Sequence, residues 1–450
     1  MSSTRCVTRP VSEAIPSSLG PDQDLAAPEL GPVPPVRAPE PEPLGISPPV
    51  PHQDREWLPA IEALRGIAAA AVVVDHCWAL SGGQASFGFG IVQGLGLWGV
   101  NIFFMLSGYL LADFFWVNRR GKTTLEFYIR RFFRIAPAYY VCVGILFLFF
   151  AQHDQIFSTQ GLKQSLANLT FTQHLFPATE SNLNVNGALW TLSIEMTLYL
   201  FLPLMAYLIS KRPIVASVGI AAVGVAWRLY IALDGAPVAH WYFGLHSTVF
   251  VPYEYLYLAR QFIGLLPIFV MGLALRWAVI HGRLRRWVTP TSRHPSIVVL
   301  IVLLVPSLLI LRETGRASFY DHWIWFTFFD YVVCILAMPA LLYGSRPVKG
   351  RLGAPMKGGV WLGERSYGLY LWHFPVILAF YGIGSAGLAP QTSHMPFRIA
   401  GIWVVSIALA WGSFSLIERP GRLLGRRLGR QVETWQRKHR RHTATDGGTL

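Results

Sequence analysis

The sequence predicts an all-α protein that crosses a membrane about ten times, and three observations lead to that fold class. The 450 residues are 53% hydrophobic and only 14% charged, with a mean hydropathy of +0.40, which is too apolar for an ordinary soluble domain. Apolar stretches of about 20 residues, long enough to cross ~30 Å of hydrocarbon as a helix, recur along the chain. The basic residues gather in alternate connectors between these stretches, which is typical of a multi-pass topology.

The length of each apolar stretch, and the glycine, proline and charged residues at its ends, define each predicted membrane helix. Short polar connectors separate the apolar stretches from one another, so each stretch is predicted to be one membrane span. The predicted spans are 58–80, 95–117, 135–151, 189–209, 214–233, 257–280, 297–311, 323–343, 361–381 and 399–417.

The two ends of the chain differ from this membrane domain, which we place at 57–420. Residues 1–56 are proline-rich and polar without apolar periodicity, which predicts a disordered cytoplasmic tail. Residues 421–450 form a basic cytoplasmic tail. Pro420 cannot donate a backbone hydrogen bond, so we expect the last membrane helix to stop there, with Glu418 paired to a neighbouring arginine.

The basic clusters also set the expected orientation. They follow the second, fourth, sixth, eighth and tenth spans, so the positive-inside rule places both termini in the cytoplasm. We expect the membrane to be the plasma membrane. Topology therefore explains the net charge of +14, and no nucleic-acid partner is expected. The four cysteines show neither a disulfide pattern nor zinc-ligand spacing, so no metal site is expected.

Ionisable side chains inside the predicted helices mark a candidate site. Arg65 and His76 stand eleven residues apart in the first span, so at ~100° per residue they point in nearly the same direction. The predicted topology places His76, Glu195 and Asn101 at a similar depth in the outer half of the membrane. A charge in hydrocarbon costs about 2.5–3.5 kcal/mol and usually marks a pathway or a reaction site. The alternatives are that Arg65 snorkels to the headgroups and that His76 is a hydrogen-bonded core residue.

A cluster of arginines and aromatic residues opens the third span. Arg130, Arg131 and Arg134 alternate with aromatic residues in FYIRRFFRIAPAYY. As positive charges in a cytoplasmic connector, these arginines help to set the membrane topology whatever else they do. Guanidinium groups beside aromatic rings also suit the phosphates and base of a nucleotide. The ninth span carries Tyr367 near its cytoplasmic end and His373 near mid-depth, and we expect His373 to be structural.

Several sequence patterns follow one another in a fixed order from Glu62 to Pro420. They are the Arg65 to His76 spacing, then GVNIFFMLSGYLL, RRFFRIAPAYY, LWTLSIEMTLYLFLP, RSYGLYLWHFP and IERP. Together they resemble the acyltransferase-3 family of integral membrane O-acyltransferases. The resemblance implies a ten-helix enzyme that moves an acyl group, often acetyl, from cytoplasmic acyl-CoA to a hydroxyl of a sugar, glycan, antibiotic or lipid.

The resemblance also implies roles for single residues. His76 is the expected catalytic residue and Arg65 its partner in the pattern. The family commonly has an acid in the second-span pattern, where this chain has Asn101. Many relatives carry an esterase-like domain after the last helix, and we expect none here because only a short basic tail follows Pro420.

These residues suggest one mechanism, in which acyl-CoA is a donor substrate and no cofactor is permanently bound. The nucleotide of the donor would bind the arginines of the third span, and His76 would act as general base on the acceptor hydroxyl, worth about 10²- to 10⁴-fold in rate. Glu195 would orient the imidazole, and Asn101 or Ser107 would donate to the oxyanion. Tyr367 is a further candidate contact to substrate, and a covalent acyl-histidine is the variant mechanism.

Other functions stay open at this point. A transporter or exporter would use His76, Glu195 and Arg65 as a proton relay, although the sequence shows no inverted repeat in support. An acyltransferase could instead act on a macrolide-type or other secondary metabolite. The expected partners are membrane lipids, acyl-CoA and a sugar-containing acceptor, such as a surface glycan, an exopolysaccharide or a glycolipid.

Overall fold

Helices make up the regular structure in a computed structural model of the protein. Among the residues that it describes there is no β-strand, which confirms the predicted all-α class. These residues belong to one compact unit, Arg55–Leu450, and the predicted tail 1–56 lies outside them. The described residues are 58–80, 89–117, 123–149, 156–180, 187–243, 252–284, 287–288, 296–311, 323–346, 351–381 and 395–446.

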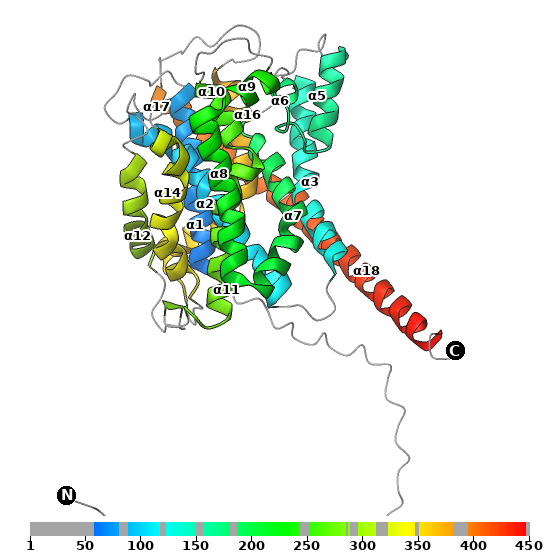
Figure 1. Ribbon diagram of the computed structural model, residues 1–450. Helices are drawn as coiled ribbons and strands as arrows, with labels where there is room; N and C mark the ends of the chain where they lie inside the picture. Colours follow the sequence, from blue (N-terminus) through cyan, green and yellow to red (C-terminus); the bar gives the residue numbers. More distant parts are fainter. Residues whose placement is uncertain are drawn as a thin grey trace, which may run out of the picture. The chain divides into compact units, whose positions relative to one another are not determined.

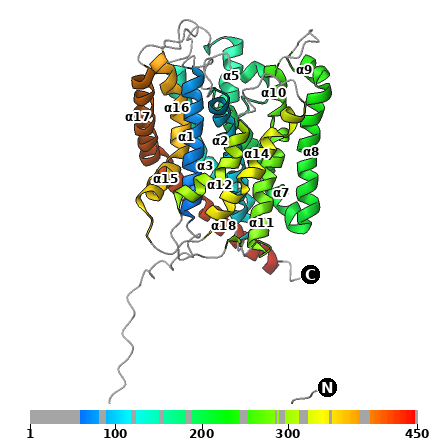
Figure 2. The same cartoon turned by 90° about the vertical axis from the view of Figure 1, so that its left-hand side faces the viewer.

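A helix coincides with each predicted membrane span. In the described part of the chain, seven helical segments are long and apolar enough to cross a membrane, and α12 is a shorter apolar helix. Figures 1 and 2 show α1 and α16 running alongside these segments, so the polytopic membrane fold is confirmed. The helices are α1 (Pro59–Leu80), α2 (Phe89–Trp116), α3 (Thr124–Phe149), α7 (Trp190–Lys211), α8 (Pro213–Asp234), α11 (Phe262–Ile280), α12 (Ile297–Leu309), α14 (Trp323–Gly344), α16 (Ser366–Tyr381) and α17 (Met395–Ser413).

Shorter helices complete the unit. Four of them, α5, α6, α9 and α10, lie at one end of the bundle, at the top of Figure 1, whereas α15 leads directly into α16. Their bounds are α5 (Thr159–Leu169), α6 (Pro177–Glu180), α9 (Ala236–Phe243), α10 (Pro252–Ala259) and α15 (Ala354–Glu364).

The first helix lies inside the bundle, where it packs against α2, α14, α15 and α16. Its alanine-rich sequence gives it a thin profile, and Leu64, Ala68 and Val72 are buried. A thin helix allows close neighbours on several sides. The polar side chains of α1 therefore point at other helices, which is the setting expected for a functional site inside a membrane.

Two glycines fix the close approach of α2 and α11. A Cβ atom at Gly108 would lie 2.1 Å from the carbonyl oxygen of Phe269, and one at Gly272 would lie 2.0 Å from that of Met105. Both distances are far below a van der Waals contact, so each helix leaves room for the backbone of the other. This contact holds α2 in place, and α2 forms one wall of the site described below.

The last membrane helix does not end at Pro420, so the predicted helix stop there is wrong. A π-helical turn, η3 (Phe414–Glu418), joins α17 to α18 (Arg419–Asp446) without a break. The Arg419 N–H donates to the Phe414 carbonyl across this wider turn. Proline is tolerated in the first turn of a helix, where its missing N–H has no partner to lose, and Pro420 is the second residue of α18. Glu418 pairs loosely with Arg422 at 3.9 Å, as expected.

The predicted basic tail is largely this helix, which packs along α3. Gly421, Gly425 and Gly429 recur every fourth residue and face α3. A Cβ atom at Gly421 would lie 2.7 Å from the Phe133 carbonyl oxygen. The small residues thus let α18 lie directly against the arginine-rich start of α3.

Candidate active site

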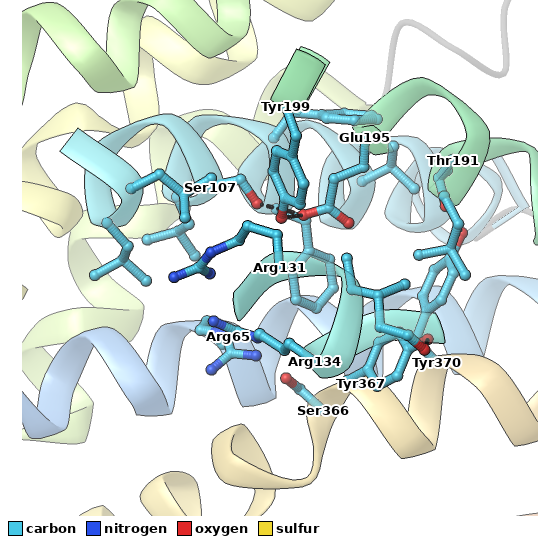
Figure 3. Close-up of a pocket in the computed structure, with 18 residues that line it drawn as sticks. Arg65, Ser107, Arg131, Arg134, Thr191, Glu195, Tyr199, Ser366, Tyr367 and Tyr370 are labelled. Atoms are coloured by element: carbon cyan, nitrogen blue, oxygen red, sulfur yellow. Dashed lines mark hydrogen bonds between the residues drawn. The ribbon is translucent and has the colours of Figure 1, made fainter. Parts of the chain in front are cut away.

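A cavity opens between α1, α2, α3, α7 and α16 (Figure 3). Its volume, counted as the space open to the centres of water molecules, is ≈ 90 Å³. Figure 3 shows Ser107 and Arg131 towards one end of the view and Thr191 and Tyr370 towards the other. The polar side chains around it are Arg65, Ser107, Arg131, Arg134, Thr191, Glu195, Tyr199, Ser366, Tyr367 and Tyr370.

Three arginines give the cavity an excess of positive charge. Arg65 comes from α1 and is paired with Glu62, with 2.8 Å between Nη1 and Oε2. Arg131 and Arg134 come from α3, and Arg134 makes no hydrogen bond or ion pair to any residue that the structure describes. Glu195 is the carboxylate among the lining residues. Guanidinium groups in excess over carboxylates favour an anionic ligand, phosphate above all.

Arg130 lies outside this cavity, although it belongs to the same arginine cluster in the sequence as Arg131 and Arg134. It forms an ion pair with the buried Glu126 one turn earlier, on the side of α3 that faces α18. Consecutive residues on a helix point ~100° apart, so Arg130 and Arg131 face different neighbours. The structure therefore brings two of the three predicted nucleotide-binding arginines into the cavity.

Two hydroxyl groups hold Glu195. Its Oε1 accepts a hydrogen bond from Ser107 Oγ on α2 at 2.9 Å and another from the Tyr199 hydroxyl, one turn further along α7 (Figure 3). Glu195 therefore does not bond to the His76 ring as was expected, and His76 has a different partner. A shared depth, which was all that the sequence predicted for the two residues, does not fix the direction in which a side chain points around its helix.

The partner of His76 is His373 on α16, 297 positions later in the chain. His76 Nδ1 lies 2.8 Å from His373 Nε2, and the planes of the two rings are nearly parallel, at 13° to each other. The ring of Phe374 meets His76 edge-on at 5.5 Å between centroids. His373 is completely buried, while His76 is partly exposed and does not line the cavity. No sequence spacing could have indicated this pair.

Tyr370 belongs both to the cavity wall and to the surroundings of the histidine pair. Its hydroxyl bonds to Thr191 Oγ1 and to the Ala188 carbonyl, both at 2.7 Å, which ties α16 to the start of α7. Its own carbonyl oxygen lies 2.6 Å from His373 Nδ1. The cavity and His76 are thus connected through two residues of α16.

Ser366 and Tyr367, at the start of α16, complete the cavity wall. The Tyr367 hydroxyl donates to the Ile135 carbonyl on α3 at 2.8 Å. Ser366 is completely buried, and its hydroxyl has no hydrogen-bond partner among the described residues. A buried hydroxyl without a partner costs about 1–3 kcal/mol. Because Ser366 faces the cavity, a bound ligand is the natural partner for its hydroxyl.

Asn101 does not line this cavity, so its role as an oxyanion donor stays a prediction. It is fully buried, and its Nδ2 donates to Asp330 Oδ1 on α14 at 2.8 Å. Asp330 Oδ2 in turn binds Arg228 Nη1 on α8 at 2.6 Å. Asn101 and Ser107 are six residues apart and point about 120° away from each other on α2. Only Ser107 reaches the cavity.

Within the described part of the chain, no three histidine, cysteine, aspartate or glutamate residues lie close enough together to hold a metal ion. The chemistry that the site offers comes from three arginines, one carboxylate, several hydroxyls and the nearby imidazole pair. Such a set can bind a polyanion and move a proton.

Comparison with known proteins gives a match to the family model described as an acyltransferase domain, over residues 58–414. The peptidoglycan O-acetyltransferase OatA of Listeria monocytogenes is 25% identical over 72% of this chain and 50% of its own length. The acyltransferase MdmB of Streptomyces mycarofaciens is 26% identical over 82% of this chain and 93% of its own length.

A further relative is the O-acetyltransferase OatA of Staphylococcus aureus, which is 24% identical over 72% of this chain and 51% of its own length. The chain therefore spans about half the length of each of the OatA proteins named above. No solved structure matches it at a significant level.

Proposed function

Because this chain belongs to the acyltransferase-3 family and is an acyltransferase, we propose that it transfers an acetyl group from acetyl-CoA to a hydroxyl of a sugar-containing acceptor at the cell surface. The acceptor class is supported by relatives that are named as O-acetyltransferases, one of them acting on peptidoglycan. A surface glycan, an exopolysaccharide or a glycolipid each offers such a hydroxyl.

The cavity is the observation that carries this proposal. Acyl-CoA has a polyphosphate end and a thin pantetheine arm that ends in the thioester. The phosphates would bind Arg65, Arg131 and Arg134, with the unpartnered Ser366 hydroxyl donating to a phosphate oxygen. The arm would run through the cavity towards Tyr370, whose backbone oxygen bonds to the histidine beside His76.

His76 is the proposed general base. The acceptor O–H would give its proton to His76 Nε2 while its oxygen attacks the thioester carbonyl carbon. The carbon–sulfur bond then breaks, and the leaving thiolate takes the proton from His76, so that the products are the ester and free coenzyme A. Such proton transfer contributes about 10²- to 10⁴-fold in rate. Glu195 would serve the donor cavity, where it partly balances the arginines.

The positive-inside rule supports an orientation for this transfer. We place the arginine-bearing start of α3 and the basic α18 on the cytoplasmic side of the plasma membrane, with both termini inside. The donor would then enter from the cytoplasm and the acceptor from outside. The enzyme would pass only the acetyl group across the bilayer.

Binding of coenzyme A to purified protein in lipid nanodiscs tests the donor site, measured by isothermal titration calorimetry. Arg134→Ala should weaken binding about 10- to 100-fold, because hydrogen bonds between charged groups contribute about 1.5–3 kcal/mol. Arg130→Lys is the matched control, since it keeps the pair with Glu126 outside the cavity and should bind like the wild type. Equal binding by Arg134→Ala and the wild type would rule out this donor site.

Mass spectrometry of surface glycans tests the reaction itself. Cells that lack the protein, or that carry His76→Ala, should lose O-acetyl groups that the wild type adds. His76→Ala should still bind coenzyme A, because His76 does not line the cavity. A protein that moves a solute across liposome membranes without consuming acetyl-CoA would instead favour the transporter alternative.

A further inference from the structure

We propose that His373 is the positioning residue for His76 and holds it in the one tautomer whose exposed nitrogen can accept a proton. This inference rests on the proposed function, since it assigns a partner to the proposed general base. In this arrangement a neutral imidazole, and not the carboxylate of Glu195, orients His76.

The backbone of α16 determines where His373 carries its proton. His373 Nδ1 lies 2.6 Å from the carbonyl oxygen of Tyr370. A carbonyl oxygen only accepts hydrogen bonds, so His373 Nδ1 must carry the hydrogen. Neutral imidazole has a single N–H group, which leaves His373 Nε2 with a lone pair.

That lone pair then determines the tautomer of His76. His373 Nε2 lies 2.8 Å from His76 Nδ1, and two lone pairs would repel at this distance. His76 Nδ1 must therefore be the donor, and the single proton of the neutral ring is used there. His76 Nε2 keeps its lone pair and has no hydrogen-bond partner among the described residues, so it is available to take a proton from the acceptor hydroxyl.

The surroundings keep His373 in this orientation. The side chain is completely buried, and Tyr370 is itself anchored by its hydroxyl to Thr191 on α7 and to the carbonyl of Ala188 just before α7. Pro375 follows two positions later and interrupts the hydrogen-bond ladder of α16, since proline has no N–H for the Leu371 carbonyl. The Cys142 thiol on α3 contacts that carbonyl instead, with Sγ at 3.6 Å from the oxygen.

The proton balance of the reaction fits this arrangement. The acceptor proton goes to His76 Nε2 and later to the thiolate sulfur, while the proton on His76 Nδ1 stays in its bond to His373 throughout. In serine proteases a buried aspartate holds the catalytic histidine in its tautomer. Here a second imidazole would do so without placing an additional negative charge inside the membrane, which is an expensive location for one.

Two substitutions of His373 separate positioning from structural support. In His373→Leu, His76 loses its acceptor, and kcat should fall about 10²-fold, within the range of general-base contributions. In His373→Gln, the side-chain Oε1 can accept from His76 Nδ1–H, so we expect at least about tenfold of that loss to be recovered. The KM for acetyl-CoA should change by less than about twofold in both variants, because His373 does not line the donor cavity.

A matched control is His281→Leu. His281 also bonds through Nδ1 to a backbone carbonyl, that of Trp277 at 2.9 Å, but it is exposed and lies at the end of α11. This variant should keep the wild-type kcat. Coenzyme A binding by each variant in nanodiscs checks that the fold is intact.

The tautomer of His76 can be measured by NMR spectroscopy in the absence of substrates. In protein with ¹⁵N-labelled histidine, assigned by difference against His76→Ala, the His76 Nδ1 signal should be that of a protonated nitrogen and the Nε2 signal that of a bare one. A protonated Nε2 would overturn the proposal, and so would equal losses of kcat in His373→Leu and His373→Gln when both still bind coenzyme A. Full activity of His76→Ala would instead overturn the proposed function.

Discussion

Ser107 on α2 donates its hydroxyl to Glu195 Oε1 on α7 at 2.9 Å, and this bond joins two walls of the donor cavity. The Tyr199 hydroxyl donates to the same oxygen from one turn away. Glu195 is therefore held within the group of arginines, apart from the histidine pair on α1 and α16. The site has two parts, one suited to a polyanion and one suited to moving a proton.

Replacing Glu195 by glutamine should tighten the binding of coenzyme A. The change removes the carboxylate from a cavity with three arginines, and the repulsion between two unit charges about 4 Å apart is about 1 kcal/mol where water screens them fully. We expect the Kd measured by titration calorimetry to fall about 3- to 10-fold. Asp234→Asn, an exposed position at the end of α8, is the control and should leave the Kd unchanged. A Glu195→Gln variant with unchanged Kd and a kcat as low as that of His76→Ala would favour the original expectation that Glu195 orients His76.

Replacing Ser366 by alanine should raise stability while it weakens donor binding. The Ser366 hydroxyl is buried without a partner, so its removal should add about 1 kcal/mol to the free energy of unfolding. Coenzyme A should lose a hydrogen bond and bind several-fold more weakly. Thermal unfolding followed by tryptophan fluorescence, together with titration calorimetry, measures the two effects.

Ser307→Ala is the contrasting variant. Ser307 is equally buried but fully bonded, since it accepts from Trp98 Nε1 at 2.9 Å and donates to the Leu304 carbonyl at 2.7 Å. Its removal should lower stability by about 1 kcal/mol without changing the binding of coenzyme A. Loss of stability in both serine variants would show that the Ser366 hydroxyl has a partner within the protein.

A methyl group at Gly108 should destabilise the bundle. Its carbon would lie 2.1 Å from the Phe269 carbonyl oxygen, so α2 and α11 would have to separate, at the upper end of the about 1–3 kcal/mol that overpacking usually costs. Gly144→Ala in α3 is the control, because nothing lies within 4 Å of the added atom. There alanine should add about 0.5–1 kcal/mol to the free energy of unfolding through its higher helix propensity. Equal melting temperatures for the two variants would contradict the close contact of α2 and α11.

Removing the carboxylate of Asp330 should cost more stability than removing the amide of Asn101. Asp330→Ala leaves Arg228 as an unpaired buried charge, which typically costs about 3–5 kcal/mol. Asn101→Ala removes one hydrogen bond and should cost about 1–3 kcal/mol. A double replacement, Arg228→Met with Asp330→Leu, should recover part of the loss. If the double variant melts no higher than Asp330→Ala, the loss of stability in Asp330→Ala does not come from leaving Arg228 as an unpaired buried charge.

The membrane helices were predictable because apolar length is a local property of the sequence. All ten predicted spans coincide with helices, and Arg65, Arg131, Arg134, Ser107 and Tyr367 do line the cavity. The continuation past Pro420 was missed, because a π-helical turn that accommodates a proline has no sequence pattern of its own.

The sequence alone determined which residues each helix carries and how far apart they lie along its axis, because a helix rises by ~1.5 Å per residue. It could not determine which way a helix faces, since rotation about the helix axis is set by packing against neighbours far away in the chain. Only the tertiary structure turned Asn101 towards Asp330, Glu195 towards Ser107, and His76 towards a histidine 297 positions later.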